Sequence, residues 1–246
     1  MNPVSNLSRP IVLITGAARG LGAVLVRELI PDFRIWVAVR SRRQCDELRG
    51  TYSSTPGPER WFHGNLSRPE TIRRIAATSR REGECIYGIV HCPGPIEYTR
   101  RVIPDWDVWK GMFEGNVAGA VHLIRILGPT LDNGRIVLLG FSGNGRPRGY
   151  RCIAAYAAAK EALAIVACSA AKDLASRKTT VNVLAPGVFL DESGNVPAEG
   201  RRLVSEIPMK RPGRDNDITG PVRWLLSDRS AYVTGQIIKV SGGLHI

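Results

Sequence analysis

The chain has 246 residues, of which 43% are hydrophobic and 23% are charged. This composition is close to the globular average, so it excludes wholesale disorder and a fibrous repeat. The formal net charge of +12 raises nucleic-acid binding as an alternative, because a basic surface attracts any polyanion. The arginine pairs are scattered along the chain without a basic tail or zinc-finger spacing, which argues against a nucleic-acid partner.

The five cysteines form no C-x-x-C pair and are odd in number, so we expect reduced thiols, no metal site and a cytoplasmic protein. Residues 1–10 lack the basic region, apolar run and cleavage site of a secretory signal. No stretch approaches the ~20 apolar residues of a membrane span. We therefore expect no membrane partner.

Short apolar runs alternate with helical patterns along the chain. The first run, 11–15, predicts a strand, 21–29 predicts a helix, and 35–39 predicts the second strand. Further strands are expected near 61–63, 86–92, 135–139, 181–185 and 236–240, and further helices around 72–76, 109–127, 156–174 and 218–226.

Strands separated by helices require parallel crossovers. The sequence therefore predicts an α/β single-domain doubly wound parallel sheet, a Rossmann fold, over residues 1–246. Residues 190–214 are rich in glycine, proline and charge. We expect them to form a substrate loop with a short helix rather than a linker.

A glycine-rich turn joins the first predicted strand to the first helix. Gly16, Gly20 and Gly22 lie in Thr15-Gly-Ala-Ala-Arg-Gly-Leu-Gly22. Glycines allow close approach of the backbone to a ligand, and the helix amino end attracts a pyrophosphate. The turn therefore predicts a dinucleotide-binding site.

Tyr156 and Lys160 are four residues apart in an alanine-rich segment, so on a helix they share one face. A nearby ammonium favours the phenolate, and we expect it to lower the pKa of the tyrosine toward the range of general acid–base catalysis. The pair therefore predicts proton transfer above a bound cofactor.

These motifs resemble the short-chain dehydrogenase/reductase family, including members similar to 3-oxoacyl carrier-protein reductases. The family's T-G-x-x-x-G-x-G is matched at every fixed position by 15–22, Y-x-x-x-K by 156–160, and N-x-x-x-P-G by 182–187. The resemblance implies that Tyr156 and Lys160 are catalytic and that Asn116 holds a water in the proton relay. It also implies a homo-oligomer, either a dimer or a tetramer.

The substrate-orienting serine is the uncertain member of this set. Relatives usually carry it 13 residues before the tyrosine, whereas Ser142 lies 14 before Tyr156, and Phe141 follows the strand in its place. Because neighbouring glycines make this loop permissive, Ser142 is kept as the fourth candidate catalytic residue.

The cofactor expected is NADP(H). An acid at the end of the second strand selects NAD by bonding the ribose, but here Val39 takes that position and Arg40 follows. Arg40 and Arg19 are candidates to pair with the additional phosphate. Asn65 replaces the family's aspartate next to adenine. The predicted cofactor contacts are Gly16, Arg19, Gly20, Leu21, Gly22, Arg40, Ser41, Asn65, Leu66, Gly94, Tyr156, Lys160, Pro186, Gly187 and Phe189.

The family's N-N-A-G stretch is represented loosely by His91-Cys-Pro-Gly94, and His91 is better read as a packed strand-end residue than as a base. Asp191 lies near the nicotinamide-contact position of relatives, and its role stays open.

The activity expected is NADPH-dependent hydride transfer to a carbonyl. Several arginines between Ser142 and Tyr156, together with Arg100 and Arg101, suggest a 3-oxoacyl thioester or another anionic or carrier-bound ketone. Two alternatives stay open: a reductase of a C=N or C=C bond in a heterocycle, and a non-catalytic dinucleotide-binding regulator.

Overall fold

A computed structural model describes residues 9–146, 148–191 and 193–245 of the chain. Its centre is one parallel sheet of seven strands in the order β3-β2-β1-β4-β5-β6-β7. The strands are β1 (Ile11–Thr15), β2 (Arg34–Val39), β3 (Arg60–His63), β4 (Ile86–His91), β5 (Arg135–Leu139), β6 (Thr180–Pro186) and β7 (Ile237–Val240). This order confirms the predicted doubly wound sheet.

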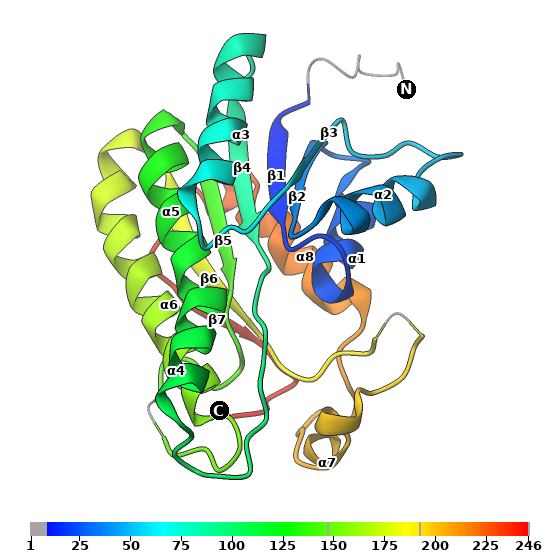
Figure 1. Ribbon diagram of the computed structural model, residues 1–246, viewed down its shortest axis with the longest axis vertical. Coiled ribbons are helices and arrows are strands. Elements are labelled where there is room, and N and C mark those ends of the chain that lie inside the picture. The colour runs from blue at the N-terminus through cyan, green and yellow to red at the C-terminus, as the bar shows by residue number, and fades with distance from the viewer. Residues whose placement is uncertain (1–8, 147, 192, 246) are drawn as a thin grey trace.

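Helices cover both faces of the sheet, as Figure 1 shows. The helices are α1 (Gly20–Leu29), α2 (Arg42–Thr51), α3 (Pro69–Glu82), α4 (Trp106–Phe113), α5 (Gly119–Leu127), α6 (Ala154–Leu174), α7 (Arg201–Val204) and α8 (Asp215–Leu225). α3, α5 and α6 lie on one face, and α1, α2 and α8 on the other. α7 lies within the predicted loop 190–214 and stands apart from both layers in Figure 1.

Two apolar cores, one on each face, hold the layers together. Alternate residues of β1 point to opposite faces, so Leu13 joins the core under α3, α5 and α6, while Val12 and Ile14 join the core under α1, α2 and α8. All five residues of β1 are buried, as expected of a parallel strand covered on both sides.

α2 is a helix that the sequence analysis did not predict. Its ten residues are largely polar, and among them only Cys45 and Leu48 are buried. Ser41 starts the helix, because its side-chain oxygen accepts a hydrogen bond from the backbone amide of Gln44 at 3.3 Å. Local capping compensates here for the weak apolar periodicity.

The helix predicted over 109–127 is not a single α-helix. α4 begins at Trp106 and ends at Phe113, a π-helical turn follows over Glu114–Ala118, and α5 continues from Gly119. The Asn116 side chain donates to the backbone oxygen of Met112, four residues earlier, at 2.9 Å. This bond competes with the ordinary backbone ladder and accounts for the wider turn.

α6 corrects the expectation that no stretch is long enough to span a membrane. The segment Ala154–Arg177 reaches 24 residues and is apolar enough by length and composition, which is weak evidence by itself. Half of it is buried inside the protein, where α6 packs against β6 and α4. Its apolar composition therefore matches a helix of the protein core.

The carboxyl ends of the central strands form one edge of the sheet. Thr15 at the end of β1 pairs with Ala38 in β2 and with His91 in β4. Strand order reverses between β1 and β4, and ligands of doubly wound sheets bind at such switch points. The glycine turn, Arg40 and the residues after His91 therefore surround one place.

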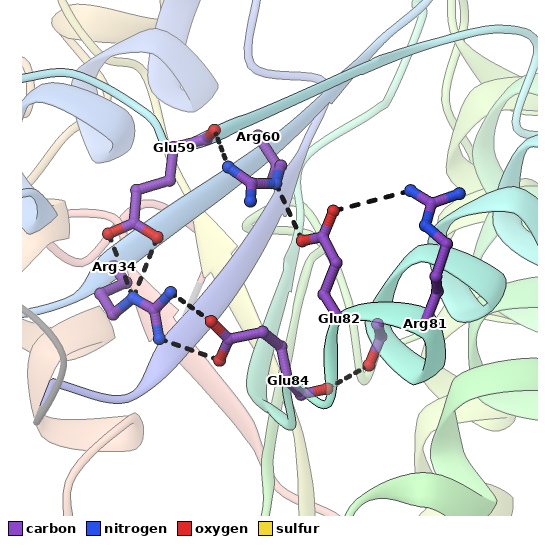
Figure 2. Close-up of polar contacts among 7 residues, drawn as sticks. Arg34, Glu59, Arg60, Arg81, Glu82 and Glu84 are labelled. Atoms are coloured by element: carbon purple, nitrogen blue, oxygen red, sulfur yellow. Dashed lines mark hydrogen bonds and ion pairs between the residues drawn. The ribbon is translucent and has the colours of Figure 1, made fainter.

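An ion-pair cluster fastens the opposite edge (Figure 2). Arg34, at the start of β2, donates to Glu84 at 2.6 and 2.9 Å and to Glu59 at 2.9 and 3.1 Å. Its side chain is only 11% exposed. The pKa of Glu84 is lowered, chiefly by the hydrogen bonds from Arg34. The cluster links β2 to the segments that open β3 and β4.

We predict that Glu84→Gln lowers the free energy of unfolding by about 1.5 kcal/mol at neutral pH, because charged hydrogen bonds from a largely buried arginine are lost. A carboxylate with a lowered pKa stabilises the fold above its ordinary value of 4.5, and this contribution disappears as pH falls through the folded value. Urea unfolding across this pH range should show the difference from wild type shrinking toward zero.

Glu82→Gln is the matched control. Glu82 is 25% exposed, much like Glu84 at 26%, but its partners Arg60 and Arg81 are 46% and 72% exposed. We expect a smaller loss for it. A Glu84→Gln deficit that stayed constant into acid would contradict the assignment.

Candidate active site

The glycine turn can approach a ligand closely because it carries no side chains at Gly16 and Gly22. Neighbouring atoms already lie where those side chains would be. Gly16 has a φ of +70°, and its amide donates to Ala38 at 3.0 Å. A Cβ atom on Gly22 would lie 2.2 Å from the Gly16 oxygen. Arg19, the residue before α1, forms no side-chain cap, and the first turn of α1 contains no acid. This arrangement fits a pyrophosphate at the amino end of α1.

The residues predicted for the adenosine end lie in the loops after β1, β2 and β3. Arg19, Arg40 and Ser41 are exposed, and Leu66 is partly buried against the core. The Asn65 side-chain oxygen accepts from the Ser67 amide at 3.0 Å and from the Ser67 hydroxyl at 2.9 Å. The Asn65 side-chain nitrogen is therefore the group left to bond adenine, as a donor.

Lys160 is buried in α6, with 2% of its surface exposed. Its ammonium donates to the backbone oxygen of Leu139 at 2.7 Å and to that of Pro93 at 3.4 Å. Burial lowers the pKa of Lys160 to about 8. A Cβ atom on Gly94 would lie 2.7 Å from this ammonium, so the predicted glycine contact and the lysine are neighbours.

Tyr156 lies one helical turn before Lys160, and the ammonium is 5.8 Å from the centre of its ring. The expectation that the tyrosine pKa is lowered is wrong. Burial raises the pKa of Tyr156 above its ordinary value, and the neighbouring Tyr98 raises it further. Desolvation disfavours the phenolate, so the phenol keeps its proton at neutral pH.

Asn116 is completely buried in the π-helical turn. Its amide nitrogen donates to the backbone oxygens of Pro95 and Met112 at 3.0 and 2.9 Å. Its side-chain oxygen is buried without a hydrogen-bond partner among the described residues. A Cβ on Gly94 would be 3.2 Å from that oxygen. The oxygen is thus an acceptor available beside Lys160, where the predicted water would lie.

Phe141 and Ser142 both lie in the loop after β5. The Ser142 hydroxyl shares a hydrogen bond of 3.0 Å with Nδ1 of His245, near the carboxyl end of the chain. The Phe141 ring meets Tyr156 edge-on, with 5.4 Å between ring centres. The substrate-orienting role of Ser142 stays a prediction, and the structure places a phenyl ring beside Tyr156.

His91 is packed, as the sequence reading expected. It is 1% exposed, and its Nδ1 lies 2.7 Å from the Thr15 hydroxyl in a hydrogen bond. Burial, with the nearby Lys160 charge, lowers the pKa of His91 to about 3, so the imidazole is neutral. Burial likewise raises the pKa of the adjacent Cys92 thiol to about 12. Neither residue supplies a charge to the site at neutral pH.

The far side of the site is formed by the end of β6. Pro186 ends this strand, the Gly187 amide donates to Val240 at 2.9 Å, and Phe189 is buried against Gly213. The Asp191 carboxylate accepts backbone hydrogen bonds from Ser193 and Asn195, both at 2.9 Å. It therefore stabilises its own exposed turn.

The described residues include no group of three histidine, cysteine or acidic side chains that could hold a metal ion. Glycine backbone, a buried ammonium and a buried amide oxygen instead surround the switch point. Sequence reasoning missed Tyr98 as a neighbour of Tyr156. In the sequence, the available signal was an aromatic residue four positions after Gly94.

Comparison with known proteins identifies a family model and relatives that this chain resembles. The chain matches the family model described as enoyl-(acyl carrier protein) reductase over residues 16–245. It is 26% identical over 250 residues to the 3-oxoacyl-[acyl-carrier-protein] reductase FabG of Escherichia coli (strain K12), and the match covers 98% of this chain and 99% of that relative.

Solved structures share the fold across their full length. The Pseudomonas aeruginosa RhlG/NADP active-site complex superimposes with a TM-score of 0.85 at 24% identity, covering 100% of each chain. A blue fluorescent protein from a metagenomic library, in complex with NADPH, gives 0.83 at 26% identity and covers 98% of this chain and 100% of its own.

Gly22→Ala tests the glycine turn. Because the new Cβ would overlap the Gly16 carbonyl, the turn must open, and we expect nicotinamide dinucleotide affinity to fall by a factor of about 10 or more. Fluorescence titration of the cofactor measures the loss. Gly50→Ala in α2, where no atom lies within 4 Å of the new Cβ, is the control that should bind as wild type does. Unchanged affinity in Gly22→Ala would rule out this binding site.

Proposed function

The chain belongs to the short-chain dehydrogenase/reductase family of NAD(P)-dependent oxidoreductases, and on that premise we propose that it is an NADPH-dependent reductase of carbonyl substrates. The observation that carries the proposal is the cluster of Tyr156, Lys160 and Asn116 beside Gly94, at the carboxyl edge of the sheet. A phenol next to a buried ammonium suits proton transfer, which dinucleotide binding alone would not require.

The proposed chemistry divides between the cofactor and the protein. When bound, the reduced nicotinamide supplies a hydride to the carbonyl carbon. The Tyr156 hydroxyl donates its proton to the carbonyl oxygen, so that a ketone becomes an alcohol. The Lys160 ammonium, fixed by Leu139 and Pro93, stabilises the phenolate left behind. The free Asn116 oxygen holds the water through which the proton is replaced.

The preference for NADPH is supported by charge at the adenosine end. Val39 ends β2 where an acid would select NAD, and the next residue, Arg40, is exposed at the same edge as the glycine turn. Arg19 adds a second exposed guanidinium. A related structure of 26% identity is an NADPH complex, which supports the same choice.

The proposed substrate class is a 3-oxoacyl thioester or another anionic or carrier-bound ketone. FabG of Escherichia coli supports this class, since its name gives that activity and the match covers 98% of this chain. Five exposed arginines on the loops that flank Tyr156 provide positive charge for an acidic carrier: Arg100, Arg101, Arg146, Arg148 and Arg151.

A second candidate is reduction of a C=C or C=N bond. The Phe141 ring beside Tyr156 favours it, because an apolar wall suits a planar unsaturated substrate. The description of the matching family model also names an enoyl reductase, an enzyme type that reduces a C=C bond.

Cytoplasmic location and a homo-oligomeric state belong to the same proposal. All five cysteines are free, which suits a reducing compartment. Trp106 and Phe113 on α4 are exposed at 75% and 39%, apolar surface that a second copy would cover.

The first test is NADPH oxidation with a panel of ketones, acyl thioesters, enoyl thioesters and cyclic imines. We expect turnover with a carbonyl substrate, and loss of at least about 100-fold in kcat for Tyr156→Phe, because the proton donor is removed. NADPH titration should show unchanged binding in that variant. Binding without turnover across the whole panel would instead support a dinucleotide-binding regulator.

The second test concerns the cofactor. Arg40→Ala should raise the KM for NADPH about tenfold and leave that for NADH unchanged, because only the phosphate contact is lost. Arg43→Ala is the matched control, since Arg43 is also exposed but pairs with Glu47 at 2.7 Å. Equal effects of Arg40→Ala on both cofactors would contradict the NADPH assignment.

A further inference from the structure

The loop between β5 and α6, residues 140–153, carries the ring that packs against Tyr156. Phe141 in this loop meets the Tyr156 ring edge-on, with 5.4 Å between ring centres. Four residues of the loop are glycines, and its described residues form no helix or strand. Because glycine leaves a backbone permissive, the loop alone does not fix the Phe141 ring. Contacts with other segments must therefore hold it in place.

His245, in the segment after β7, contacts both arms of this loop. Its Nδ1 shares a hydrogen bond of 3.0 Å with the Ser142 hydroxyl on the first arm. Its ring meets Tyr150 of the second arm edge-on, with 6.4 Å between centres. Tyr150 in turn packs at a tilt against Phe141, with 5.7 Å between centres. A continuous line of side chains thus runs from His245 through Tyr150 and Phe141 to Tyr156.

His245 is itself held from the other side. The Lys239 ammonium, on β7, donates to the His245 backbone oxygen at 2.9 Å. The side chain of the preceding Leu244 is buried. The Met209 amide, in the predicted substrate loop, donates to the Gly242 backbone oxygen at 3.1 Å. The segment after β7 is therefore fixed to the sheet and to the substrate loop, and it presents His245 as a fixed point to the loop after β5.

The charges around His245 require a neutral side chain there. Arg148 donates from Nε to the Tyr150 hydroxyl at 2.9 Å, and its guanidinium lies 5.0 Å from the centre of that ring. Lys239 supplies a second cation at the His245 backbone. Burial, followed by the Arg148 charge, lowers the pKa of His245 below its ordinary value of 6.5. The imidazole is thus neutral at neutral pH and can accept the hydrogen bond from Ser142.

We propose that His245 is a positioning residue for Tyr156, which acts by holding the loop after β5 so that the Phe141 ring stays against the phenol. The proposal rests on the proposed reductase function and adds a residue of the segment after β7 to its site. Tyr156 must meet the carbonyl oxygen as hydride arrives at carbon, and a misplacement of about 1 Å can cost on the order of 100-fold in rate. His245 thus supports proton transfer through packing.

The first test uses the substrate that wild type turns over fastest with NADPH. His245→Ala should lower kcat about tenfold, because the loop loses both contacts. NADPH affinity, measured by fluorescence titration, should match wild type, since the glycine turn is untouched.

His245→Asn is the conservative variant. His245 has a φ of +64°, a left-handed conformation that asparagine also tolerates. The asparagine oxygen can accept from Ser142, so kcat should stay within about twofold of wild type. His122→Ala, which removes a partly buried histidine of α5, is the matched control and should retain full turnover.

A double-mutant cycle tests whether His245 acts through Phe141. Phe141→Leu removes the ring from Tyr156 and keeps an apolar side chain. If the positioning runs through that ring, adding His245→Ala to Phe141→Leu should lower kcat by less than about twofold further. A general loss of stability would instead multiply the two effects.

Hydrogen exchange provides a readout that does not depend on turnover. In His245→Ala the amides of residues 141–145 should exchange about tenfold faster than in wild type, because the loop opens more often once this anchor is lost. The amides of β1 should be unaffected.

Each outcome decides between the proposals. If wild type turns over a substrate and His245→Ala keeps its kcat, the positioning role is overturned and the reductase function stands. The role is also overturned if His245→Asn loses as much kcat as His245→Ala, or if the losses in the cycle multiply. If wild type reduces nothing in the panel, the reductase function fails, while unchanged exchange at 141–145 would show that His245 does not hold the loop.

Discussion

The hydrogen bond from the Lys160 ammonium to the Leu139 backbone oxygen is the constraint on which the rest of the site depends. It joins the middle of α6 to the end of β5 across 2.7 Å inside the protein. Removing an ammonium from water costs several kcal/mol, which only fixed acceptors offset. The lowered pKa of Lys160, about 8, records that cost. The carbonyls of Leu139 and Pro93 must therefore be held where they are. Leu139 ends β5 and Pro93 lies two residues after β4, so these two strands hold both.

Small residues make this contact possible. The face of α6 that meets the sheet is rich in buried alanines, including Ala164, Ala167 and Ala171, so the helix lies close to the strands. Gly94 has no side chain because Lys160 and Asn116 occupy the space a Cβ would take. The Asn116 amide, turned toward Met112 and Pro95, widens its helix and leaves its oxygen facing the same place. One buried cation thus requires a small helix face, a glycine and a π-helical turn.

The sequence predicted the features that depend on local pattern. Alternating strands and helices gave the sheet, and the glycine turn and the Tyr156–Lys160 spacing located its functional edge. Other features depend on contacts between distant segments. α2 was missed because capping by Ser41, rather than an apolar stripe, starts it. The π-helical turn follows from the hydrogen bond of the Asn116 side chain, which the apolar periodicity of the sequence does not reveal. The contact between the loop after β4 and the start of α6, made by Thr99 and Cys152, spans 53 residues of sequence.

Burial of Tyr156 and Lys160 sets the electrostatics of the site. A sequence reading that considers only the lysine charge expects a phenolate, but the folded site removes water from Tyr156 and raises its pKa. Lys160, with a pKa of about 8, is still mostly charged at neutral pH. The resting site therefore holds a proton on the phenol and a cation ready to stabilise the phenolate. The raised pKa keeps Tyr156 protonated but makes it a weaker acid, so release of its proton depends on the stabilisation of the phenolate by the Lys160 cation.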